Sequence, residues 1–406
     1  MPDLPDGFDF TDPDLYAARV PLEEFAELRR TEPLWWNPQP NSREPFGDDG
    51  FWVVSRYDDV RAVSLDFDTF STYENGAIIR FADGMSREQV ETQRLIMINM
   101  DPPEHTKVRK IVSRGFTPRA INALEDTLRA RAERIVAEAR RTGGGDFVSE
   151  VACELPLQAI AELLGVPQED RLKLFAWSNQ MLGYDDPEYQ SDEQTASVEI
   201  LSYAMAMADE RQKCPMDDIV TKLTQADIDG RGLTTDEFGF FVILLAVAGN
   251  ETTRNAITHG MMALLDHPDQ WELYKAERPK SAVEEIVRWS TPVTCFQRTA
   301  LHDAEIGGRP VRAGERVGLF YASANYDESV FADPYRFDVL RDPNPHLGFG
   351  GNGPHYCLGA NLARMEIDLI FNAIADGMPN IQRTGAPRRL RSAWINGIKE
   401  LPVQYG

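Results

Sequence analysis

Residues 346–370 read HLGFGGNGPHYCLGANLARMEIDLI, a glycine-rich loop that leads through one cysteine into a helical pattern. After Cys357, large apolar side chains recur at helical spacing up to Ile370, with charged residues between them. The pattern predicts that Cys357 lies at or just before the N-terminus of a helix. There the helix macrodipole and the unpaired N–H groups favour a thiolate over a thiol.

Glycines flank this cysteine on both sides. Gly350, Gly351 and Gly353 precede it, and Gly359 follows it at the start of the predicted helix. Glycine lacks a Cβ, so a backbone of this composition can approach a flat, bulky group closely. A thiolate in such a cradle suits the axial position of a haem iron, where it donates electron density and favours O–O cleavage.

Three other interpretations of the loop compete with a haem site. A lone cysteine is most often a small buried hydrophobe. A zinc site is disfavoured, because none of the four cysteines (Cys153, Cys214, Cys295 and Cys357) forms a C-x-x-C pair. Residues 348–353 match the dinucleotide fingerprint G-x-G-x-x-G, but prolines on both sides of the loop argue against the strand–loop–helix unit that this fingerprint requires.

The loop resembles the haem-binding loop of cytochromes P450 through His355, Cys357, Gly359 and the Ala363-Arg364 pair. The resemblance implies that Cys357 is the axial thiolate ligand of haem b. It also implies that the glycine after the cysteine and the residues at the start of the loop contact the haem.

In one position the chain departs from the family. Phenylalanine usually stands seven residues before the cysteine, where this chain has Gly350, and Phe349 lies eight residues before it. Phe349, Gly350 and Gly359 are the haem contacts implied for this loop. Which side chain packs on the proximal haem face stays open, whereas the ligand is unaffected.

A second helix of unusual length is predicted between Thr234 and Asp266. Thr234 and Glu237 form a capping box, and Pro268 follows the last helical residues. About 32 residues at 1.5 Å each give a helix of roughly 50 Å, which must cross the core because most of its circumference is apolar. One of its faces carries Phe241, Leu244, Leu245, Ala248 and Thr252.

This face contains the segment Ala248-Gly-Asn-Glu251-Thr252. A carboxylate beside a hydroxyl is unusual in a buried helix, and the hydroxyl can bond back to a carbonyl one turn earlier. Taken alone, the segment could also be a solvated bend. It resembles the acid–alcohol pair of cytochromes P450, which implies that Ala248 contacts the haem, Thr252 hydrogen-bonds the dioxygen and Glu251 relays protons through water.

Other charged residues match positions that surround the haem in this family. Glu285 and Arg288 form an i, i+3 pair, which contributes little on a surface. The resemblance implies that this pair is buried and braces the region behind the haem. The two haem propionates need cationic partners. The resemblance assigns that role to His105, Arg109, Arg298 and His355.

Within the family, residues 155–170, 237–271 and 344–379 look most like actinobacterial steroid 26-monooxygenases. The resemblance implies hydroxylation of the terminal side-chain methyl (C26/C27) of cholesterol or cholest-4-en-3-one in bacterial sterol catabolism, with O2 and electrons from a ferredoxin and a ferredoxin reductase. Such a substrate needs a long apolar pocket. The predicted lining residues, each of which could instead be ordinary core, are Ile78, Ile79, Phe240, Val247, Ala248, Val293 and Trp394.

Composition and charge narrow the class of protein. The chain has 406 residues and a formal net charge of −23, which argues against a nucleic-acid partner. The longest apolar run, residues 238–249, is shorter than the roughly 20 residues that span a bilayer, and the N-terminus lacks a secretory signal. We expect no membrane span and a cytoplasmic protein, and the unpaired cysteines agree with a reducing compartment.

The pattern as a whole predicts a mainly α protein with a minor β region. Helical patterns include residues 22–30, 58–64, 105–114, 121–141 and 155–164, and strand-like segments lie near 51–55, 294–320 and the C-terminus. No linker or repeat divides the chain. We therefore expect residues 1–406 to form a single catalytic domain with the triangular cytochrome P450 fold around a buried haem.

The haem-thiolate monooxygenase interpretation leaves three alternatives: a cytochrome P450 that acts on another long apolar substrate such as a fatty acid or terpenoid, a peroxide-driven enzyme, and a non-catalytic haem-binding protein. Glu251 and Thr252 argue against the last two.

No flavin or iron–sulfur motif is present, so electrons are expected from separate proteins. Residues 105–119 contain basic but no acidic residues, and the resemblance places them beside the proximal haem face. Three of them, Lys107, Lys110 and Arg114, are predicted to steer a ferredoxin.

Overall fold

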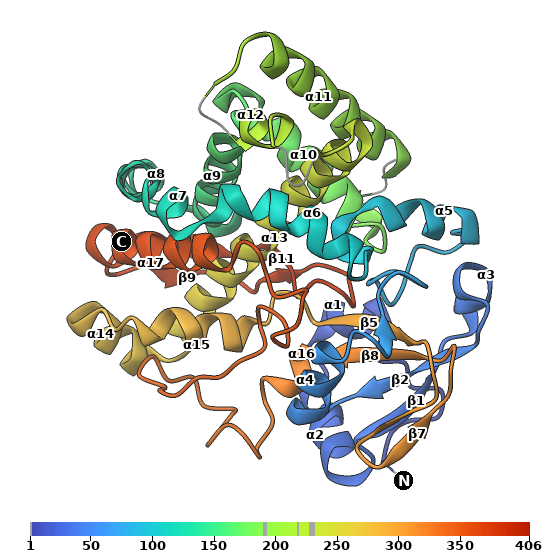
Figure 1. The fold of residues 1–406 in the computed structure, drawn as a ribbon. Coiled ribbons are helices and arrows are strands. Elements are labelled where there is room, and N and C mark those ends of the chain that lie inside the picture. Colours follow the sequence, from blue (N-terminus) through green and yellow to red (C-terminus); the bar gives the residue numbers. More distant parts are fainter. Residues whose placement is uncertain (1, 190–192, 217–218, 227–231) are drawn as a thin grey trace.

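The long helix predicted from Thr234 is α13 (Thr235–Asp266), which crosses the middle of the molecule in this computed structural model (Figure 1). The structure describes residues 2–189, 193–216, 219–226 and 232–406. The predicted capping box is present, because the side chains of Thr234 and Glu237 each accept the other's backbone N–H. Around α13 pack α9 (Glu154–Leu164), α10 (Arg171–Leu182), α11 (Glu193–Lys213), α15 (Ser281–Ser290) and α17 (Ala360–Gly377).

Helices also make up most of the remaining elements. The other α-helices are α1 (Pro13–Ala18), α2 (Leu22–Thr31), α3 (Arg43–Phe46), α4 (Tyr57–Leu65), α5 (Arg87–Thr92), α6 (Glu104–Val112), α7 (Pro118–Asn122), α8 (Glu125–Thr142), α12 (Ile219–Thr224), α14 (Pro268–Glu277) and α16 (Tyr321–Ala324). Short 3-10 or π turns are η1 (Pro40–Ser42), η2 (Gln93–Leu95), η3 (Met97–Asn99), η4 (Ser113–Phe116), η5 (Val148–Ala152), η6 (Gln168–Asp170) and η7 (Pro187–Tyr189).

Within the described ranges the strands form small sheets. They are β1 (Leu34–Pro38), β2 (Gly50–Val54), β3 (Phe70–Ser71), β4 (Gly144–Asp146), β5 (Cys295–Ala300), β6 (Ala304–Ile306), β7 (Arg309–Val311), β8 (Arg316–Phe320), β9 (Gln382–Arg383), β10 (Arg388–Arg389), β11 (Ile398–Glu400) and β12 (Pro402–Gln404). The largest sheet has the order β1-β2-β8-β5-β3, with only β2 and β8 parallel. Smaller sheets pair β10 with β11, β6 with β7, and β4 and β9 with β12.

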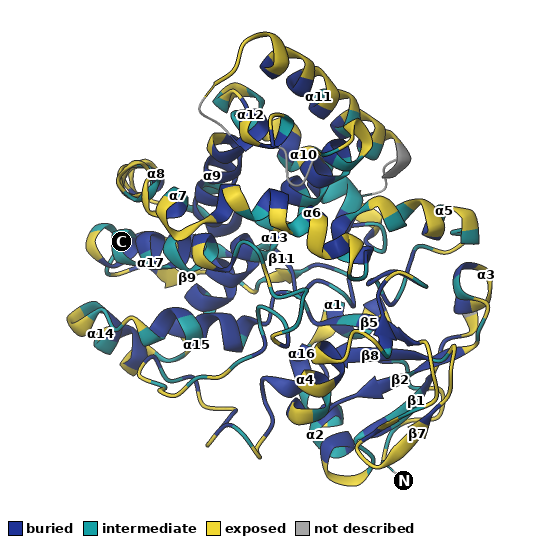
Figure 2. Ribbon diagram, in the orientation of Figure 1, coloured by how far each residue is buried: buried dark blue, intermediate teal, exposed yellow. Residues whose placement is uncertain are grey.

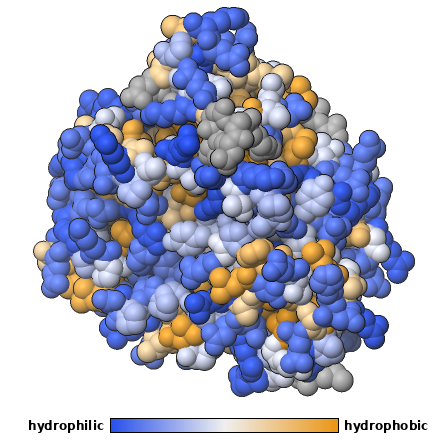
Figure 3. Space-filling view, viewed as in Figure 1, coloured by the Kyte–Doolittle hydropathy of each residue, from blue (hydrophilic) through white to orange (hydrophobic). Residues whose placement is uncertain are grey.

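The molecule has a triangular outline in the view of Figure 1, with the five-stranded sheet at the lower right and helices elsewhere. Figure 2 shows that the interior helices, α13 among them, are buried along most of their length. Hydrophilic side chains cover most of the face seen in Figure 3. In the part of the chain that the structure describes, no helix is long and apolar enough to cross a membrane. The predicted class, mainly α with a minor β region, is confirmed.

Several elements match the sequence patterns closely. The strand predicted at 51–55 is β2, and the helices predicted at 22–30 and 58–64 are α2 and α4. Gly143 and Gly165 end α8 and α9 in the left-handed conformation, as expected of glycines that terminate helices.

The helix predicted for residues 121–141 is confirmed as α8 from residue 125 onward, but its predicted start was wrong. The structure has two helices there, α7 and α8, because Thr117 starts the first one independently. Its side chain accepts the backbone N–H of Ala120, and Pro118 occupies the first turn. The predicted basic helix 105–114 is likewise shorter, since α6 ends at Val112 and continues as the 3-10 turn η4.

The Glu285–Arg288 pair of α15 is fully buried, as the resemblance implied. Two nitrogens of the Arg288 guanidinium, Nε and Nη2, each donate a hydrogen bond to the Glu285 carboxylate at 2.8 Å. Nη1 of Arg288 donates at 2.9 Å to the carbonyl oxygens of Asn325 and Pro334. The pair therefore ties α15 to two loops that run beside it.

Replacing Arg288 with leucine is expected to lower the free energy of unfolding by about 3–5 kcal/mol, because the Glu285 carboxylate would lose its main partner inside the protein. The exposed Arg129–Glu125 pair of α8 provides the control. Arg129→Leu should change the free energy of unfolding by less than about 1 kcal/mol. Denaturant unfolding followed by circular dichroism measures both variants, and equal losses would contradict a structural role for the buried pair.

Candidate active site

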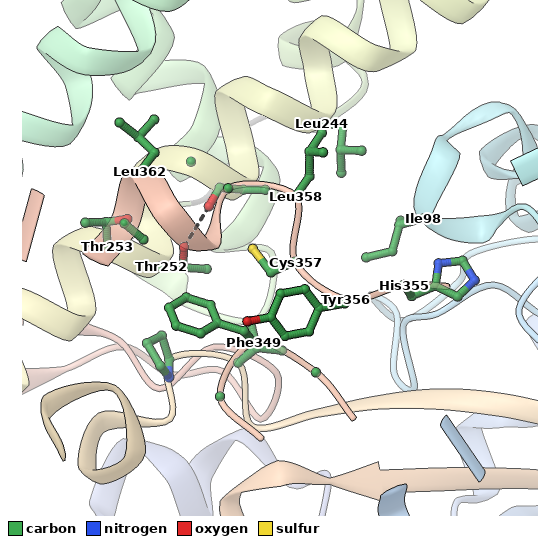
Figure 4. A pocket seen from close by; sticks show the side chains of 18 of the residues that line it. Ile98, Leu244, Thr252, Thr253, Phe349, His355, Tyr356, Cys357, Leu358 and Leu362 are labelled. Atoms are coloured by element: carbon green, nitrogen blue, oxygen red, sulfur yellow. Dashed lines mark hydrogen bonds between the residues drawn. The ribbon is translucent and has the colours of Figure 1, made fainter. Parts of the chain in front are cut away.

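An apolar cavity lies between α13 and the cysteine loop, residues 346–359 (Figure 4). α6, α17 and the segment leading into β5 also contribute side chains to its wall. The apolar face predicted on the long helix is part of this wall, since Phe241, Leu244, Leu245, Ala248 and Thr252 all line the cavity. The face identified from helical periodicity is thus the face that the cavity presents to a ligand.

Cys357 lies three residues before α17, as predicted, and its side chain is exposed to the cavity. Its backbone N–H donates to the carbonyl oxygen of Phe349 at 2.9 Å, which closes the loop. Burial raises the pKa of the Cys357 thiol, and the nearby N–H groups and the guanidinium groups of Arg109 and Arg364 oppose that rise. Desolvation thus opposes the thiolate that the helix N-terminus favours, and the N–H groups and the two guanidinium groups support that thiolate.

The departure at position 350 has a conformational reason. Gly350 has φ +97°, which a phenylalanine would adopt only with strain. The aromatic ring is supplied instead by Phe349, which lines the cavity and stacks under the Arg364 guanidinium at 4.4 Å. In Figure 4 this ring lies beside Cys357.

Two glycines of the loop serve a purpose that the sequence did not indicate. A Cβ on Gly353 would lie 2.0 Å from the carbonyl oxygen of Ser64, and one on Gly351 would lie 2.3 Å from the Ser64 hydroxyl. These glycines therefore let the loop lie against the end of α4. Gly359 has no protein atom within 4 Å of a Cβ and lines the cavity, so it retains the predicted role of leaving room for a ligand.

Two acids of α15 hold the ends of the cysteine loop. Glu284 contacts Arg364 after the cysteine at 2.6 Å and His346 before it at 2.8 Å. Burial alone would raise the pKa of Glu284, but the hydrogen bonds from His346 and Arg364 hold it at about 2. Glu285 accepts a hydrogen bond from Asn344 at 3.0 Å. The loop is thus fixed on both sides of Cys357 by one helix.

The four predicted cationic partners gather at the cavity wall: His105, Arg109, Arg298 and His355. The rings of His105 and His355 lie 4.3 Å apart, and Arg298 is buried with one nitrogen bonded to the Gln297 carbonyl oxygen at 2.7 Å. Burial, together with the charges of Arg109 and Arg298, lowers the pKa of His105 to about 4.

The two arginines of this cluster lack an ion-pair partner in the described part of the chain, although the Asp101 carboxylate lies close enough to act on His105 and Arg298. Within the described ranges no carboxylate forms an ion pair with Arg109 or Arg298, and Nδ1 of His105 is buried without a hydrogen-bond partner. Buried cations and donors are costly unless they are paired. The cluster therefore fits a ligand that carries carboxylates, as the propionates of a haem would.

Thr252 faces the cavity from α13, on the side opposite the loop (Figure 4). Its hydroxyl donates to the Ala248 carbonyl oxygen at 2.7 Å, the bond to the preceding turn that the sequence suggested. Gly249 also lines the cavity, but a Cβ there would lie 2.3 Å from the Ile160 side chain of α9. The glycine at position 249 therefore lets α13 pack closely against α9 and also leaves room for a ligand.

Glu251 does not line the cavity. Its side chain is 1% exposed and forms a buried ion pair with Arg254 on the far side of α13. The acid and the alcohol of the predicted pair thus point in different directions. An E-x-x-R spacing identical to that of Glu285 and Arg288 was the sequence signal for this contact.

The residues predicted to line a substrate pocket divide into two groups. Ala248 and Val293 line the cavity. The others lie outside its lining: Ile79 is in the core under the sheet, the Trp394 ring is tilted against Phe296, and Ile78, Phe240 and Val247 are half-buried. Lining residues that the sequence did not single out include Met97, Ile98, Phe296, Leu358, Leu362 and Glu366. Several of these residues lie in short turns and loops, which have no periodic sequence pattern by which their burial could be predicted.

A thiol that faces an apolar cavity, with a hydroxyl opposite and buried bases for two carboxylates, is the arrangement of a haem-thiolate protein. Of the four cysteines, only Cys357 lines the cavity, since Cys153 and Cys295 are buried elsewhere and Cys214 is on the surface. No strand precedes the loop in residues 321–359, so a dinucleotide site is excluded.

Comparison with known proteins identifies the family. Residues 280–375 match the family model described as Cytochrome P450. The chain is 69% identical over 405 residues to a steroid C26-monooxygenase of Rhodococcus jostii (strain RHA1), covering 100% of this chain and 86% of the relative. It is 61% identical over 406 residues to a steroid C26-monooxygenase of Mycobacterium tuberculosis (strain ATCC 25618 / H37Rv), covering 100% and 94%.

A solved structure agrees with these relatives. A cytochrome P450 of Mycobacterium marinum, in complex with pseudoionone, matches with a TM-score of 0.91 and 38% identity, covering 98% of this chain and 99% of that chain. The chain therefore belongs to the cytochrome P450 family, and the predicted resemblance and fold are confirmed.

Replacing Cys357 with serine should abolish the strongly red-shifted Soret band of the reduced carbon monoxide complex, because a hydroxyl is a poor substitute for a thiolate ligand. Cys214→Ser, at the exposed cysteine, is the matched control and should leave the band unchanged. Cys153→Ser and Cys295→Ser should also retain it in the folded fraction. An imidazole-type band in the folded wild type would contradict thiolate ligation.

Proposed function

We propose that this chain hydroxylates the terminal side-chain methyl group, C26, of a steroid such as cholesterol or cholest-4-en-3-one. The main support for this proposal is sequence identity: over its whole length the chain is 69% and 61% identical to two steroid C26-monooxygenases. The cavity supports it, because apolar side chains form most of its wall. We further propose that residues 1–406 act as one catalytic domain.

The proposed cofactor is haem b, which Cys357 would bind through its sulfur and the four bases would hold at its carboxylates. Two observations support this assignment: the position of the thiol in the cavity, and the lack of an ion-pair partner for Arg109 and Arg298 among the described residues. When bound, haem with thiolate ligation activates O2, so that one oxygen atom enters a C–H bond and the other leaves as water, with two electrons and two protons consumed.

The chain's own residues supply binding and proton transfer in this proposal. The apolar faces of α13 and of the loop bind the sterol side chain and exclude water from the reacting carbon. The Thr252 hydroxyl, which donates to the Ala248 carbonyl oxygen, would exchange that bond for one into the cavity when it donates a hydrogen bond or passes a proton there. Glu251 supplies that proton from the other side of α13.

Electrons are proposed to come from a ferredoxin and a ferredoxin reductase, docked at α6 and η4. Lys110 and Arg114 are exposed there, in a protein whose net charge is −23. Lys107, the third base predicted to steer this partner, forms an ion pair with Glu104. Arg109 turns inward and donates to the Tyr356 carbonyl oxygen at 2.5 Å. A basic surface in an acidic protein would attract and orient a small acidic partner.

A titration with a panel of steroids, fatty acids and terpenoids tests the substrate class. Cholesterol or cholest-4-en-3-one should shift the Soret band at lower concentration than any fatty acid or terpenoid, and turnover with ferredoxin should give the C26 alcohol. Mass spectrometry of the product locates the oxygen atom. Preferred binding and oxidation of a fatty acid would replace the steroid proposal by the alternative substrate class.

Replacing Thr252 with alanine is expected to leave haem content and steroid affinity intact, but to reduce the product formed per NAD(P)H consumed by about tenfold. The reason is that the hydroxyl acts in proton transfer after the substrate has bound. Thr258→Ala is the matched control, because Thr258 makes the same bond to the preceding turn of α13, at 2.9 Å to the Arg254 carbonyl oxygen, outside the cavity. Equal ratios in wild type and Thr252→Ala would remove the hydroxyl from the reaction.

Charge reversal at Lys110 or Arg114 should slow reduction by ferredoxin by about tenfold at low salt and leave steroid affinity unchanged. Added salt should slow the wild type and reduce its difference from the variants, because screening removes the attraction. Arg43→Glu, on exposed α3, controls for the change in net charge. Stopped-flow measurement of the reduction rate decides the question, and insensitivity to both charge and salt would place docking elsewhere.

A further inference from the structure

Two parts of the cavity wall come from segments that lie far apart along the chain. α13 supplies Thr252 among other residues, and a segment after α15, residues 292–296, supplies Pro292, Val293 and Phe296. We call residues 292–296 the wall segment. The distance between α13 and the wall segment limits which carbon of a long apolar substrate can reach the reacting position. Contacts that fix this distance therefore bear on the site of oxidation, even where they lie outside the cavity.

The wall segment is paired with the loop between β10 and β11, residues 390–397. The backbone N–H of Asn396 in this loop donates to the Pro292 carbonyl oxygen at 2.9 Å. Val293 and Ile395 form an antiparallel bridge beside that bond. Because both bonded residues of the wall segment line the cavity, a shift of the loop would move the cavity wall with it.

The side chain of Asn396 anchors the loop on two further sides. Its Nδ2 donates at 2.5 Å to the carbonyl oxygen of Ser290, the last residue of α15. Its Oδ1 accepts a hydrogen bond from the Arg389 guanidinium at 2.6 Å. Asn396 is buried, so the loss of either bond would leave a polar group without a partner. The loop is thus tied at one residue to α15 and to β10.

His259 joins the same residue to α13. It follows Thr252 by about two helical turns and therefore lies on the same face of the helix. Nε2 of His259 lies 2.9 Å from the Asn396 carbonyl oxygen. Burial and the charge of Arg389 lower the pKa of His259 to about 3, so the ring is neutral and Nε2 carries the proton that it donates. One hydrogen bond therefore links the helix that carries Thr252 to the loop that holds the wall segment.

We propose that His259 and Asn396 are positioning residues that set the distance between α13 and the wall segment, and thereby direct oxidation to the terminal methyl group. This proposal rests on the proposed steroid function. A primary C–H bond is stronger than the tertiary C–H bond of the adjacent branch carbon, C25. Oxidation at the methyl group therefore needs a substrate that is held in place, and a small displacement of the wall favours the branch carbon instead.

Replacing His259 with phenylalanine removes the donor and keeps an aromatic ring. The ratio of the C26 alcohol to alcohols at inner side-chain carbons should fall by about tenfold, with steroid affinity and the carbon monoxide band of the reduced protein unchanged. His259→Gln places an N–H donor near the position of Nε2 and should restore the ratio. Mass spectrometry of the products measures it in each variant.

His267→Phe is the matched control. Nδ1 of His267 also lies close to a backbone carbonyl oxygen, that of Ala263 at 2.8 Å, but this residue follows the end of α13 and does not line the cavity. The control should keep the wild-type ratio. An equal fall in His267→Phe, or a fall that His259→Gln does not reverse, would overturn the proposal.

Asn396→Asp is the second variant and serves if His259→Phe does not fold. It keeps an acceptor for Arg389 but places a carboxylate against the Ser290 carbonyl oxygen, so the product ratio should fall here as well. Asn372→Asp on α17 is its control, because Nδ2 of Asn372 likewise donates to a carbonyl oxygen, that of Asp368 at 2.8 Å. A wild-type ratio in Asn396→Asp would contradict the assigned role.

Hydrogen–deuterium exchange provides a measurement that needs no substrate. Peptides that cover residues 292–297 and 390–397 should exchange faster in His259→Phe than in the wild type, whereas peptides from β2 should not change. Unchanged exchange in the first two peptides, or faster exchange with a wild-type product ratio, would overturn the proposal. If the wild type oxidises no steroid, the steroid function fails while the exchange result stands, and the product ratio is then measured on the compound that the wild type does oxidise.

Discussion

The two neighbouring carboxylates of α15 are the constraint on which the site depends. Glu285 neutralises the fully buried Arg288, and Arg288 in turn binds the Asn325 carbonyl oxygen, while Asn325 Oδ1 accepts the N–H of Leu347 at 2.7 Å. Glu284 holds Arg364 on the far side of the cysteine. A loop rich in glycine has much conformational entropy to lose, so its position must be fixed by contacts outside it. One short helix provides these contacts before and after Cys357.

The sequence predicted the helical framework where local chemistry and periodicity agreed. Thr234 and Glu237 define the start of α13, and its apolar face proved to be the cavity wall. The same reasoning misplaced the start of the helix predicted at residues 121–141, because apolar spacing continues from α7 into α8 and only the capping by Thr117 reveals α7. Periodicity indicates which face is buried, whereas capping indicates where a helix begins, and the second signal was overlooked.

The sequence predicted which residues belong to the site more fully than it predicted where their side chains point. Cys357, the four bases and Thr252 all reach the cavity. Glu251 does not, because a buried carboxylate takes the cation one turn away, and Ile79 packs into the core beside Gly318. Gly351 and Gly353 face α4, which no local pattern could indicate, since the contact joins segments almost 290 residues apart. Orientation depends on long-range partners that a single sequence does not reveal.

The four bases at the cavity wall have a consequence for assembly in the cell. Burial, together with the charges of Arg109 and Arg298, lowers the pKa of both His105 and His355, so folding gathers the four bases at a cost in desolvation and in repulsion between histidine and arginine. A ligand with two carboxylates relieves that repulsion only in the folded chain, and by mass action it shifts the folding equilibrium toward the native state. The supply of cofactor and the amount of folded protein are then linked quantities. A cell short of porphyrin would accumulate a less stable chain that is more exposed to proteolysis.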